Sequence, residues 1–306
     1  MNHKRIVIAG GSGFIGSALA REFQAQKFEV IILTRKPQGR TDGIRETAWD
    51  GRHTGAWIHA LDGADAVINL AGKDVNCRHN TANVCQLIAS RVNSVNAIAD
   101  ALAKIKSPPR VWVQASAIGF YGDTGDHSRA EKFPSGENTL AEICRQWEAA
   151  FDSATLPQTR KVVLRIGFVL GRDGGALPVL SRLTKYYLGG AAGGGRQYIS
   201  WIHLVDLVQM FAVVVRRNIL NGTYNAVSPN PVTNAEFMRE LRQVLGRPWS
   251  PPVPAPAVRL GAWLMKSEPT LALASQRCSA DKFLEMEFKF QFPQLHDALD
   301  NLCRKN

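Results

Sequence analysis

Residues 10–16 carry a spacing that could bind phosphate, and they read Gly-Gly-Ser-Gly-Phe-Ile-Gly. Gly11, Gly13 and Gly16 give the pattern G-x-G-x-x-G, and with Gly10 in place of Gly11 the pattern is G-x-x-G-x-x-G. Glycine lets a ligand approach the backbone because no Cβ obstructs it, and a helix N-terminus favours negative charge. The turn therefore predicts a site for the phosphates of a dinucleotide, the alternative being a tight strand–helix turn without a ligand. The residues assigned to the site are Gly10, Gly11, Ser12, Gly13, Phe14, Ile15 and Gly16.

Such a turn needs a strand before it and a helix after it. Residues 4–9 form a short apolar run that predicts a buried strand, and residues 14–26 carry apolar side chains at helical spacing. Strands and helices then alternate as far as residue 166, which requires crossover connections and a parallel sheet covered on both faces. We therefore expect a doubly wound α/β sheet of the Rossmann type. The further expected strands are 29–33, 45–49, 66–70, 111–115 and 161–166, and the further helices are 84–104 and 139–153.

The end of the second expected strand reads Leu33-Thr34-Arg35-Lys36. A site for NAD(H) usually carries Asp or Glu here, because a carboxylate binds the ribose hydroxyls. This chain has two cations and no acid at that point, and an arginine can hold a 2′-phosphate through two parallel hydrogen bonds. The pattern favours NADP(H), with Thr34, Arg35 and Lys36 as contacts. The alternative is that Arg35 and Lys36 only form a solvated turn.

The pattern changes after Gly171. Five of the seven residues at 189–195 are glycine, which argues against regular structure and predicts a mobile loop. We expect residues 1–228 to form an NADP-binding domain, with the glycine-rich loop 171–198 contributing to its cleft. Residues 229–306 are expected to form a small, mainly helical substrate lobe at the edge of the sheet where α/β folds bind ligands. The elements expected here are strands 199–202 and 222–227, helices 203–215 and 234–245 (the latter capped by Thr233 and Gly246), an extended connector at 248–256 with five prolines, and two or three short helices ending at 295–302.

Four further segments align with one known pattern. They are NLAG at 69–72, SAIGFYG at 116–122, RIGFVLG at 165–171 and WIHLVDL at 201–207. Together they resemble the extended short-chain dehydrogenase/reductase superfamily, which includes nucleotide-sugar epimerases and dehydratases. The resemblance is narrowed to the atypical "epimerase family protein" subgroup, named for nucleoside-diphosphate-sugar epimerases, by Trp49-Asp50, Gly195-Arg196-Gln197, Ser200-Trp201-Ile202-His203 and the tail after Pro248.

This resemblance covers nearly the whole chain and implies an NADP-binding Rossmann domain with a small C-terminal lobe. It places Leu70, Ala71 and Gly72 at the cofactor. For Arg165 it implies either a contact to the cofactor or structural support of the site. The epimerase label of the subgroup comes largely from the fold, and a fold does not establish chemistry.

The usual catalytic pair of the superfamily is missing. Its members use a tyrosine as general acid/base, with a lysine four residues later that lowers the tyrosine pKa and holds the nicotinamide ribose. The corresponding positions in this chain are Leu140 and Cys144. Leucine exchanges no proton and a thiol supplies no fixed positive charge, so the standard relay is absent.

Other residues are candidates for the chemistry. Tyr121 belongs to a Tyr-Gly pair that lies near the nicotinamide ring in relatives, the alternative role being packing or a wall of the substrate site. Ser116 stands one position from Ala117, which replaces the usual Ser or Thr, and is a candidate to bond the nicotinamide amide or a substrate oxygen. Cys144 and Glu148, one helical turn apart, are a third candidate if both face the cleft, and the alternative for them is a core side chain and a surface acid.

Composition restricts the partners. The formal net charge is +11, but no run of five basic residues and no RNA- or DNA-binding motif occurs, so nucleic acid is not the expected partner. We expect a small-molecule substrate of anionic or nucleotide-like chemistry, with Arg196, Gln197 and Trp201 flanking the glycine loop at the cleft. The alternative is that this loop is a disordered part of the surface.

Cysteine usage and hydropathy indicate the compartment. The five cysteines form no CxxC pair and are odd in number, which argues against a disulfide framework and a zinc site. No apolar stretch is long enough to span a bilayer. We expect a cytoplasmic protein without a bound metal or a membrane partner.

The sequence supports two main hypotheses for the function. The first is an NADP(H)-dependent oxidoreductase or epimerase whose substrate and proton donor the sequence does not identify. The second is a non-catalytic NADP(H)-binding sensor or assembly factor, which the loss of the relay favours. A third hypothesis, a basic scaffold for nucleic acid, is supported by the net charge alone.

Overall fold

The computed structural model describes residues 4–247 and 249–304, and its centre is a parallel sheet. The sheet has seven strands in the order β10-β6-β5-β4-β1-β2-β3, and every neighbouring pair is parallel. The expected doubly wound Rossmann fold is thereby confirmed. The strands are β1 (Arg5–Ala9), β2 (Glu29–Thr34), β3 (Arg45–Ala48), β4 (Ala66–Asn69), β5 (Val111–Ala117), β6 (Arg160–Ile166) and β10 (Gly222–Ala226).

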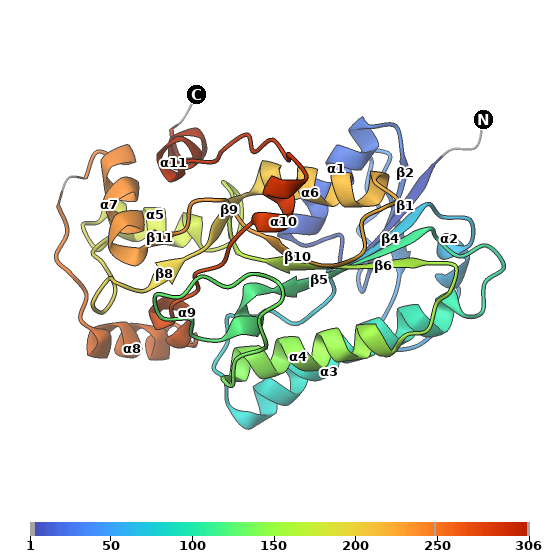
Figure 1. The fold of residues 1–306 in the computed structure, drawn as a ribbon, viewed down its shortest axis with the longest axis horizontal. Coiled ribbons are helices and arrows are strands. Elements are labelled where there is room, and N and C mark those ends of the chain that lie inside the picture. The colour runs from blue at the N-terminus through green and yellow to red at the C-terminus, as the bar shows by residue number, and fades with distance from the viewer. Residues whose placement is uncertain (1–3, 248, 305–306) are drawn as a thin grey trace.

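Helices cover both faces of the sheet. In Figure 1, α1 (Phe14–Ala25) and α6 (Leu204–Arg216) lie along one face, and α3 (Thr81–Leu102) and α4 (Thr139–Ser153) lie along the other. The strands between them are apolar on both sides, and consecutive residues such as Ile6, Val7 and Ile8 are fully buried. A short helix, α2 (Ile58–Leu61), precedes β4.

Asparagine side chains set the starts of the two long helices. The Asn80 side chain accepts a hydrogen bond from the Asn83 N–H, so α3 begins three residues earlier than the apolar spacing alone predicts. The Asn138 side chain accepts from the Ala141 N–H at the start of α4. The Asn138 cap fixes the start of α4, which carries Leu140 and Cys144 at the positions of the usual catalytic pair.

Residues 168–203 are more structured than the sequence predicts. The segment expected as a glycine-rich loop contains a helix, α5 (Leu177–Lys185), and it follows a short strand, β7 (Phe168–Leu170). The single strand expected at 199–202 is two strands, β8 (Tyr198–Ile199) and β9 (Trp201–His203). β9 pairs with β7, whereas β8 pairs with β11 (Val232–Thr233). Ser200 separates them because its backbone N–H donates to the Gln276 carbonyl.

The glycine segment at 189–195 is irregular but closely packed. A Cβ at Gly190 would overlap the carbonyl of Pro251, and a Cβ at Gly195 would lie 3.0 Å from the Ala235 Cβ. The Gly193 N–H donates to the Val253 carbonyl at 2.8 Å. The glycines therefore let the loop pack against the connector and against α7 (Asn234–Val244).

The C-terminal segment is helical, as expected, but contains more helices than predicted. α7 starts with a capping box between Thr233 and Glu236. Within the described residues, four helices rather than two or three follow the connector, and the proline-rich connector ends earlier because Pro256 lies in the first turn of the first one. They are α8 (Ala255–Leu264), α9 (Thr270–Leu273), α10 (Asp281–Glu285) and α11 (Leu295–Cys303).

A second hydrophobic cluster joins this lobe to the preceding elements. It combines Leu170, Leu177 and Trp201 with Phe237 of α7 and Leu299 of α11. Residues on both sides of position 228 therefore share one cluster. No described helix has the length and apolarity needed to cross a membrane.

Candidate functional site

The glycine turn lies where the strand order of the sheet reverses. β1 pairs with β2 on one side and with β4 on the other, so the loops after β1 and β4 leave in opposite directions and open a crevice. The NLAG segment follows β4, and a Cβ on Gly10 would lie 3.0 Å from the backbone of Leu70 and Ala71. Asn69 fixes that approach, because its Oδ1 accepts from the Ala71 N–H at 3.0 Å.

Three of the four glycines are required by the chain itself. Gly10 has φ +75°, a conformation that residues with a Cβ rarely adopt. A Cβ on Gly11 would lie 2.7 Å from the Ile32 side chain, and one on Gly16 would lie 2.5 Å from the Gly11 Cα. Gly10 therefore allows the turn itself, Gly11 allows the close contact with Ile32 of β2, and Gly16 allows α1 to pack against the turn.

Gly13 differs from the other three. Its φ is −78°, which any residue adopts, and a Cβ there would lie 3.4 Å from the Gly10 carbonyl oxygen, the sole neighbour within 4 Å among the described residues. Gly13 is also the N-cap of α1, where no described side chain caps the helix. Phe14 and Ile15 supply the first N–H groups of this helix start. The absence of a side chain at Gly13 thus leaves these N–H groups accessible to a phosphate.

Phe14 closes the turn from the other side. Its ring lies against the loop that follows β7, and a Cβ on Gly171 or Gly174 would overlap it. The side chain of Phe14 is therefore a packing contact, and its backbone is the part available to a ligand.

Arg35 lines a pocket at the ends of β2 and β3. The pocket encloses about 520 Å³. Thr34, the residue before Arg35, has its hydroxyl oxygen 3.3 Å from that of Ser12, and this contact joins the glycine turn to the end of β2. Lys36 is exposed and is not part of the pocket wall. The residues that line the pocket are Arg35, Ala48, Trp49, Asp50, His53, Thr54, Gly55, Ala56 and Trp57.

The sheet register brings three distant polar residues onto one face. Ser116 of β5 is the register partner of Arg165 of β6, and Arg165 is the register partner of Asn225 of β10. Side chains in register on parallel strands point to the same face. Glu148 of α4 covers that face, so these residues meet in one buried cluster.

Arg165 is the centre of this cluster. Its Nε and Nη2 donate to the two carboxylate oxygens of Glu148 at 2.9 and 2.7 Å. Its Nη1 donates to the Tyr121 hydroxyl at 2.8 Å, and its guanidinium carbon lies 3.4 Å from the centre of the Phe120 ring. Arg165 is 5% exposed, and all three of its nitrogens have partners. Of the two roles left open for Arg165, this geometry supports the structural one, because the buried guanidinium is bonded to protein groups through each of its three nitrogens.

The same cluster occupies both catalytic candidates. The Tyr121 hydroxyl donates to Asn225 Oδ1 at 2.8 Å, and Tyr121 is 4% exposed. Burial raises the pKa of Tyr121 to about 12, which is opposite to the change that a general acid/base requires. The Ser116 hydroxyl lies within β5, not after it, and donates to Glu148 at 2.6 Å. The structure thus presents neither hydroxyl to an open site.

The positions of the missing relay lie at the start of α4. Cys144 is buried, and burial raises the pKa of its thiol to about 11, so the thiol is not a ready proton carrier. Leu140 faces Gly119, where an added Cβ would lie 3.4 Å from the Leu140 Cβ. The proposal of a Cys144–Glu148 pair facing a cleft is wrong, because both side chains are buried and Glu148 is bound to Arg165.

A small second pocket opens beside Leu140. It encloses about 160 Å³ and is lined by His79, Asn138, Thr139, Leu140, Glu268 and Thr270. Glu268 joins the C-terminal lobe to the segment after β4, because its Oε2 accepts from the His79 N–H at 3.3 Å. No local sequence pattern indicates this pair, since the two residues are 189 positions apart.

Two residues expected beside the glycine loop have structural roles. Trp201 is fully buried and donates its indole N–H to the Asn230 carbonyl at 2.9 Å. Gln197 donates to the carbonyls of Ala192 and Ala272. The expectation of an aromatic residue in the cleft is therefore wrong for Trp201, which packs in the hydrophobic cluster that joins the lobe to the preceding elements.

The sheet order and the glycine turn at its switch point define a Rossmann-type α/β protein. The chain belongs to the NAD dependent epimerase/dehydratase family, whose model matches residues 6–226. A domain of unknown function, DUF1731, matches residues 253–302. The family resemblance expected from the sequence is confirmed.

Relatives extend over almost the whole chain. The epimerase family protein SDR39U1 of Bos taurus is 34% identical over 302 residues, covering 96% of this chain and 98% of the relative. A crystal structure of human SDR39U1 (isoform 2) with NADPH has a TM-score of 0.86 at 31% identity and covers 97% of this chain and 98% of the other. A nucleoside-diphosphate sugar epimerase from Corynebacterium glutamicum has a TM-score of 0.79 at 31% identity, covering 98% of this chain and 58% of the other.

Proposed function

We propose that this chain binds NADP(H) across the crevice between the glycine turn and the end of β2, and acts there as an oxidoreductase or epimerase on a small molecule. The observation that carries the proposal is Gly13. Neither its backbone conformation nor the packing around it requires glycine, and Ser, Thr, Asp or Asn would serve equally well as the N-cap, so a ligand that approaches the start of α1 is the explanation that we propose. The human relative that was crystallised with NADPH supports the same cofactor.

Each end of the cofactor has residues that suit it. The first N–H groups of α1, from Phe14, Ile15 and Gly16, would hold the pyrophosphate, with Gly10 and Gly11 shaping the turn. Arg35 would hold the 2′-phosphate, since it lines the pocket beside Ser12 and Thr34. The backbone of Leu70, Ala71 and Gly72 would form the opposite wall, because it passes next to Gly10.

The bound nicotinamide would supply hydride exchange with a carbinol or carbonyl carbon. This chain would contribute binding and orientation rather than the usual relay, because Leu140 and Cys144 occupy the relay positions and Tyr121 is buried. The pocket beside Leu140 is the site we propose for the reacting part of the substrate. His79 and Glu268 are its titratable residues, and either could hold a proton for the reacting oxygen.

The size of this pocket limits what it can hold. Its volume of about 160 Å³ lies below the range of about 300–1,000 Å³ that encloses a drug-sized ligand. An anionic or nucleotide-like substrate would therefore place its reacting group there and leave its remaining part outside.

The direct test is equilibrium binding of NADPH and NADH, followed by the change in nicotinamide fluorescence. We expect NADPH to bind more tightly, and Arg35→Ala to lower NADPH affinity on the order of 10- to 100-fold while leaving NADH unchanged. Lys36→Ala is the control, because Lys36 is also an exposed cation but lies outside the pocket wall. Absence of NADPH binding by the wild-type chain would refute the proposal.

A non-catalytic NADP(H) sensor or assembly factor is the second candidate function. It is favoured by the burial of Tyr121, Ser116 and Cys144, because none of these three side chains presents a hydroxyl or thiol to an open site. Turnover separates the two. Oxidation of bound NADPH by carbonyl compounds, reduction of bound NADP+ by nucleotide sugars, or formation of a sugar epimer would support the enzyme if it is lost in His79→Gln or Glu268→Gln with Kd for NADPH unchanged. A constant cofactor redox state without any epimer formed would support the sensor.

A further inference from the structure

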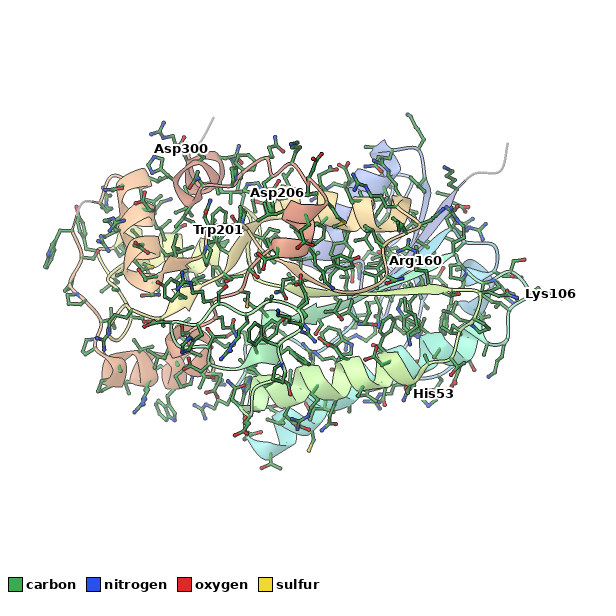
Figure 2. The ribbon with its side chains drawn as sticks, viewed as in Figure 1. His53, Lys106, Arg160, Trp201, Asp206 and Asp300 are labelled. Carbon is green, nitrogen blue, oxygen red and sulfur yellow. The ribbon has the colours of Figure 1, made fainter. Side chains whose placement is uncertain are left out.

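A histidine lies in the same pocket as Arg35. Asp50 follows β3 and forms a tight turn, in which its Oδ1 accepts from the backbone N–H groups of Arg52 and His53 at 2.8 and 2.9 Å. Its Oδ2 lies 2.6 Å from His53 Nδ1. The carboxylate therefore fixes the position and orientation of the imidazole ring. His53 lies at the periphery of the molecule in Figure 2, and its side chain is 80% exposed.

The pairing with Asp50 leaves the other ring nitrogen free. Because Nδ1 faces the carboxylate, it carries the proton, and Nε2 is the nitrogen that a ligand can reach. When the ring is protonated, Nε2 becomes a donor with a positive charge. Hydrogen bonds from the backbone and from His53 hold the pKa of Asp50 well below its usual range, so the carboxylate stays ionised and faces the ring as an anion.

Arg35 and His53 line the pocket together. They and Asp50 are the titratable or charged side chains in its described wall, and the remaining residues of the wall carry no charge. Asp50 faces His53 through hydrogen bonds, so the net charge that the wall offers a ligand is positive while His53 is protonated. An arginine and an imidazolium around one pocket suit a phosphate monoester, which carries up to two negative charges.

We propose that His53 is a second cation for the 2′-phosphate of NADP(H) and makes the preference for NADP(H) over NAD(H) depend on pH. The proposal rests on the proposed binding of NADP(H). Histidine side chains change charge between about pH 5 and pH 8, and a bound phosphate favours the charged form. The contribution of His53 is therefore present in acid and is lost as pH rises. Arg35 stays charged throughout and sets the preference that remains.

The test is the ratio of NADPH to NADH affinity at about pH 6 and about pH 8.5, measured by fluorescence titration. Taking the ratio removes the effect of pH on the contacts that the two cofactors share, and leaves the effect on the 2′-phosphate. We expect His53→Gln to lower NADPH affinity about tenfold at the acid pH and by less than about twofold at the basic pH, with NADH unchanged at both. At the basic pH, His53→Lys should bind NADPH more tightly than the wild type does, because lysine stays charged there.

Two substitutions serve as controls. Arg52→Gln removes an exposed cation next to His53 in the same turn, and His59→Gln removes another exposed histidine; neither residue lines the pocket. Both should keep the wild-type ratio at both pH values. The second ionisation of the 2′-phosphate itself, near pH 6, is common to all variants and cancels in the comparison between them.

The outcomes separate this inference from the proposed function. If the wild-type chain binds neither cofactor, the proposed function fails and the role of His53 fails with it. If NADPH binds and Arg35→Ala weakens it, but His53→Gln keeps the wild-type ratio at both pH values, the proposed function stands and the role of His53 is refuted. An equal loss in His59→Gln or Arg52→Gln would also refute it, because the effect would then be one of general surface charge.

Discussion

Glu148 and Arg165 form a two-point ion pair between α4 and β6, with nitrogen–oxygen distances of 2.9 and 2.7 Å and both side chains buried. One helical turn after Cys144, this chain has a closed polar cluster in which Glu148 and Arg165 are bonded to Ser116 and Tyr121. Its role is to fix α4 and the segment after β5 against the sheet. Four predictions follow from this arrangement and from the site around it.

Breaking the pair should destabilise the fold. In Glu148→Gln the guanidinium of Arg165 stays buried with less compensation, and loss of one member of a buried pair costs about 3–5 kcal/mol. The measurement is urea unfolding followed by circular dichroism. Arg145→Met is the matched control, because its ion pair with Glu142 is more exposed and should contribute at most about 1 kcal/mol. Equal effects of the two substitutions would contradict a structural role for the buried pair.

Tyr121→Phe should affect stability and leave cofactor binding and turnover unchanged. The substitution removes a hydroxyl that bonds Asn225 and Arg165, and leaves those buried groups without one partner each. We expect a loss of about 1–3 kcal/mol in the free energy of unfolding. Tyr186→Phe, at an exposed tyrosine, should change nothing. A variant with normal stability and no turnover would instead assign Tyr121 a catalytic role.

Gly13→Ala and Gly10→Ala should separate cofactor binding from folding. Alanine fits at Gly13 without steric strain but is a poorer N-cap than glycine, so the free chain should lose at most about 1 kcal/mol while NADPH affinity falls by about tenfold or more. Alanine at Gly10 would have to adopt φ +75° against the backbone of Ala71, which should lower stability by about 1–2 kcal/mol. Thermal melts without cofactor and NADPH titrations give both quantities. Unchanged NADPH affinity in Gly13→Ala would remove the main support for the site.

Stability should fall in acid because of His203. Burial lowers the pKa of this residue from 6.5 to about 4, and its ring stacks on Phe292 with centroids 4.0 Å apart. Between these two pH values the unfolded chain binds a proton that the folded chain excludes, so the contribution of His203 to stability is lost as pH falls from 6.5 toward 4.

The variant His203→Asn tests this dependence. Asparagine can still cap α6, as the His203 ring does by accepting from the Val205 N–H, but it does not titrate. Burial raises the pKa of the nearby Asp206, which acts in the opposite direction and is common to both chains. Melting temperatures across this pH range should therefore fall more steeply for the wild type. Parallel curves would show that His203 does not contribute to the acid dependence.

Much of the first half of the fold could be predicted because it follows from local patterns. The strand at β1, the helix at α1 and the bounds of α4 follow from apolar spacing and turn residues. The second half was less predictable. The sequence pattern does not predict α5, because the surrounding glycines dominate it. It predicts one strand in place of β8 and β9, because Ser200, which separates them, is held by the carbonyl of Gln276 from a distant segment.

The sequence by itself determined the glycine turn, the cation at Arg35 and the loss of the relay at Leu140 and Cys144, because each depends on residue type at a fixed local spacing. The tertiary structure decided which side chains are available. Tyr121 and Asn225 are hydrogen-bonded although they are 104 positions apart, and the register of parallel strands places Arg165 between Ser116 and Asn225 and closes the cluster. The same long-range packing brings His53 to Arg35 and Glu268 to His79, since pairing between strands and packing of the lobe against them join segments that no local spacing relates.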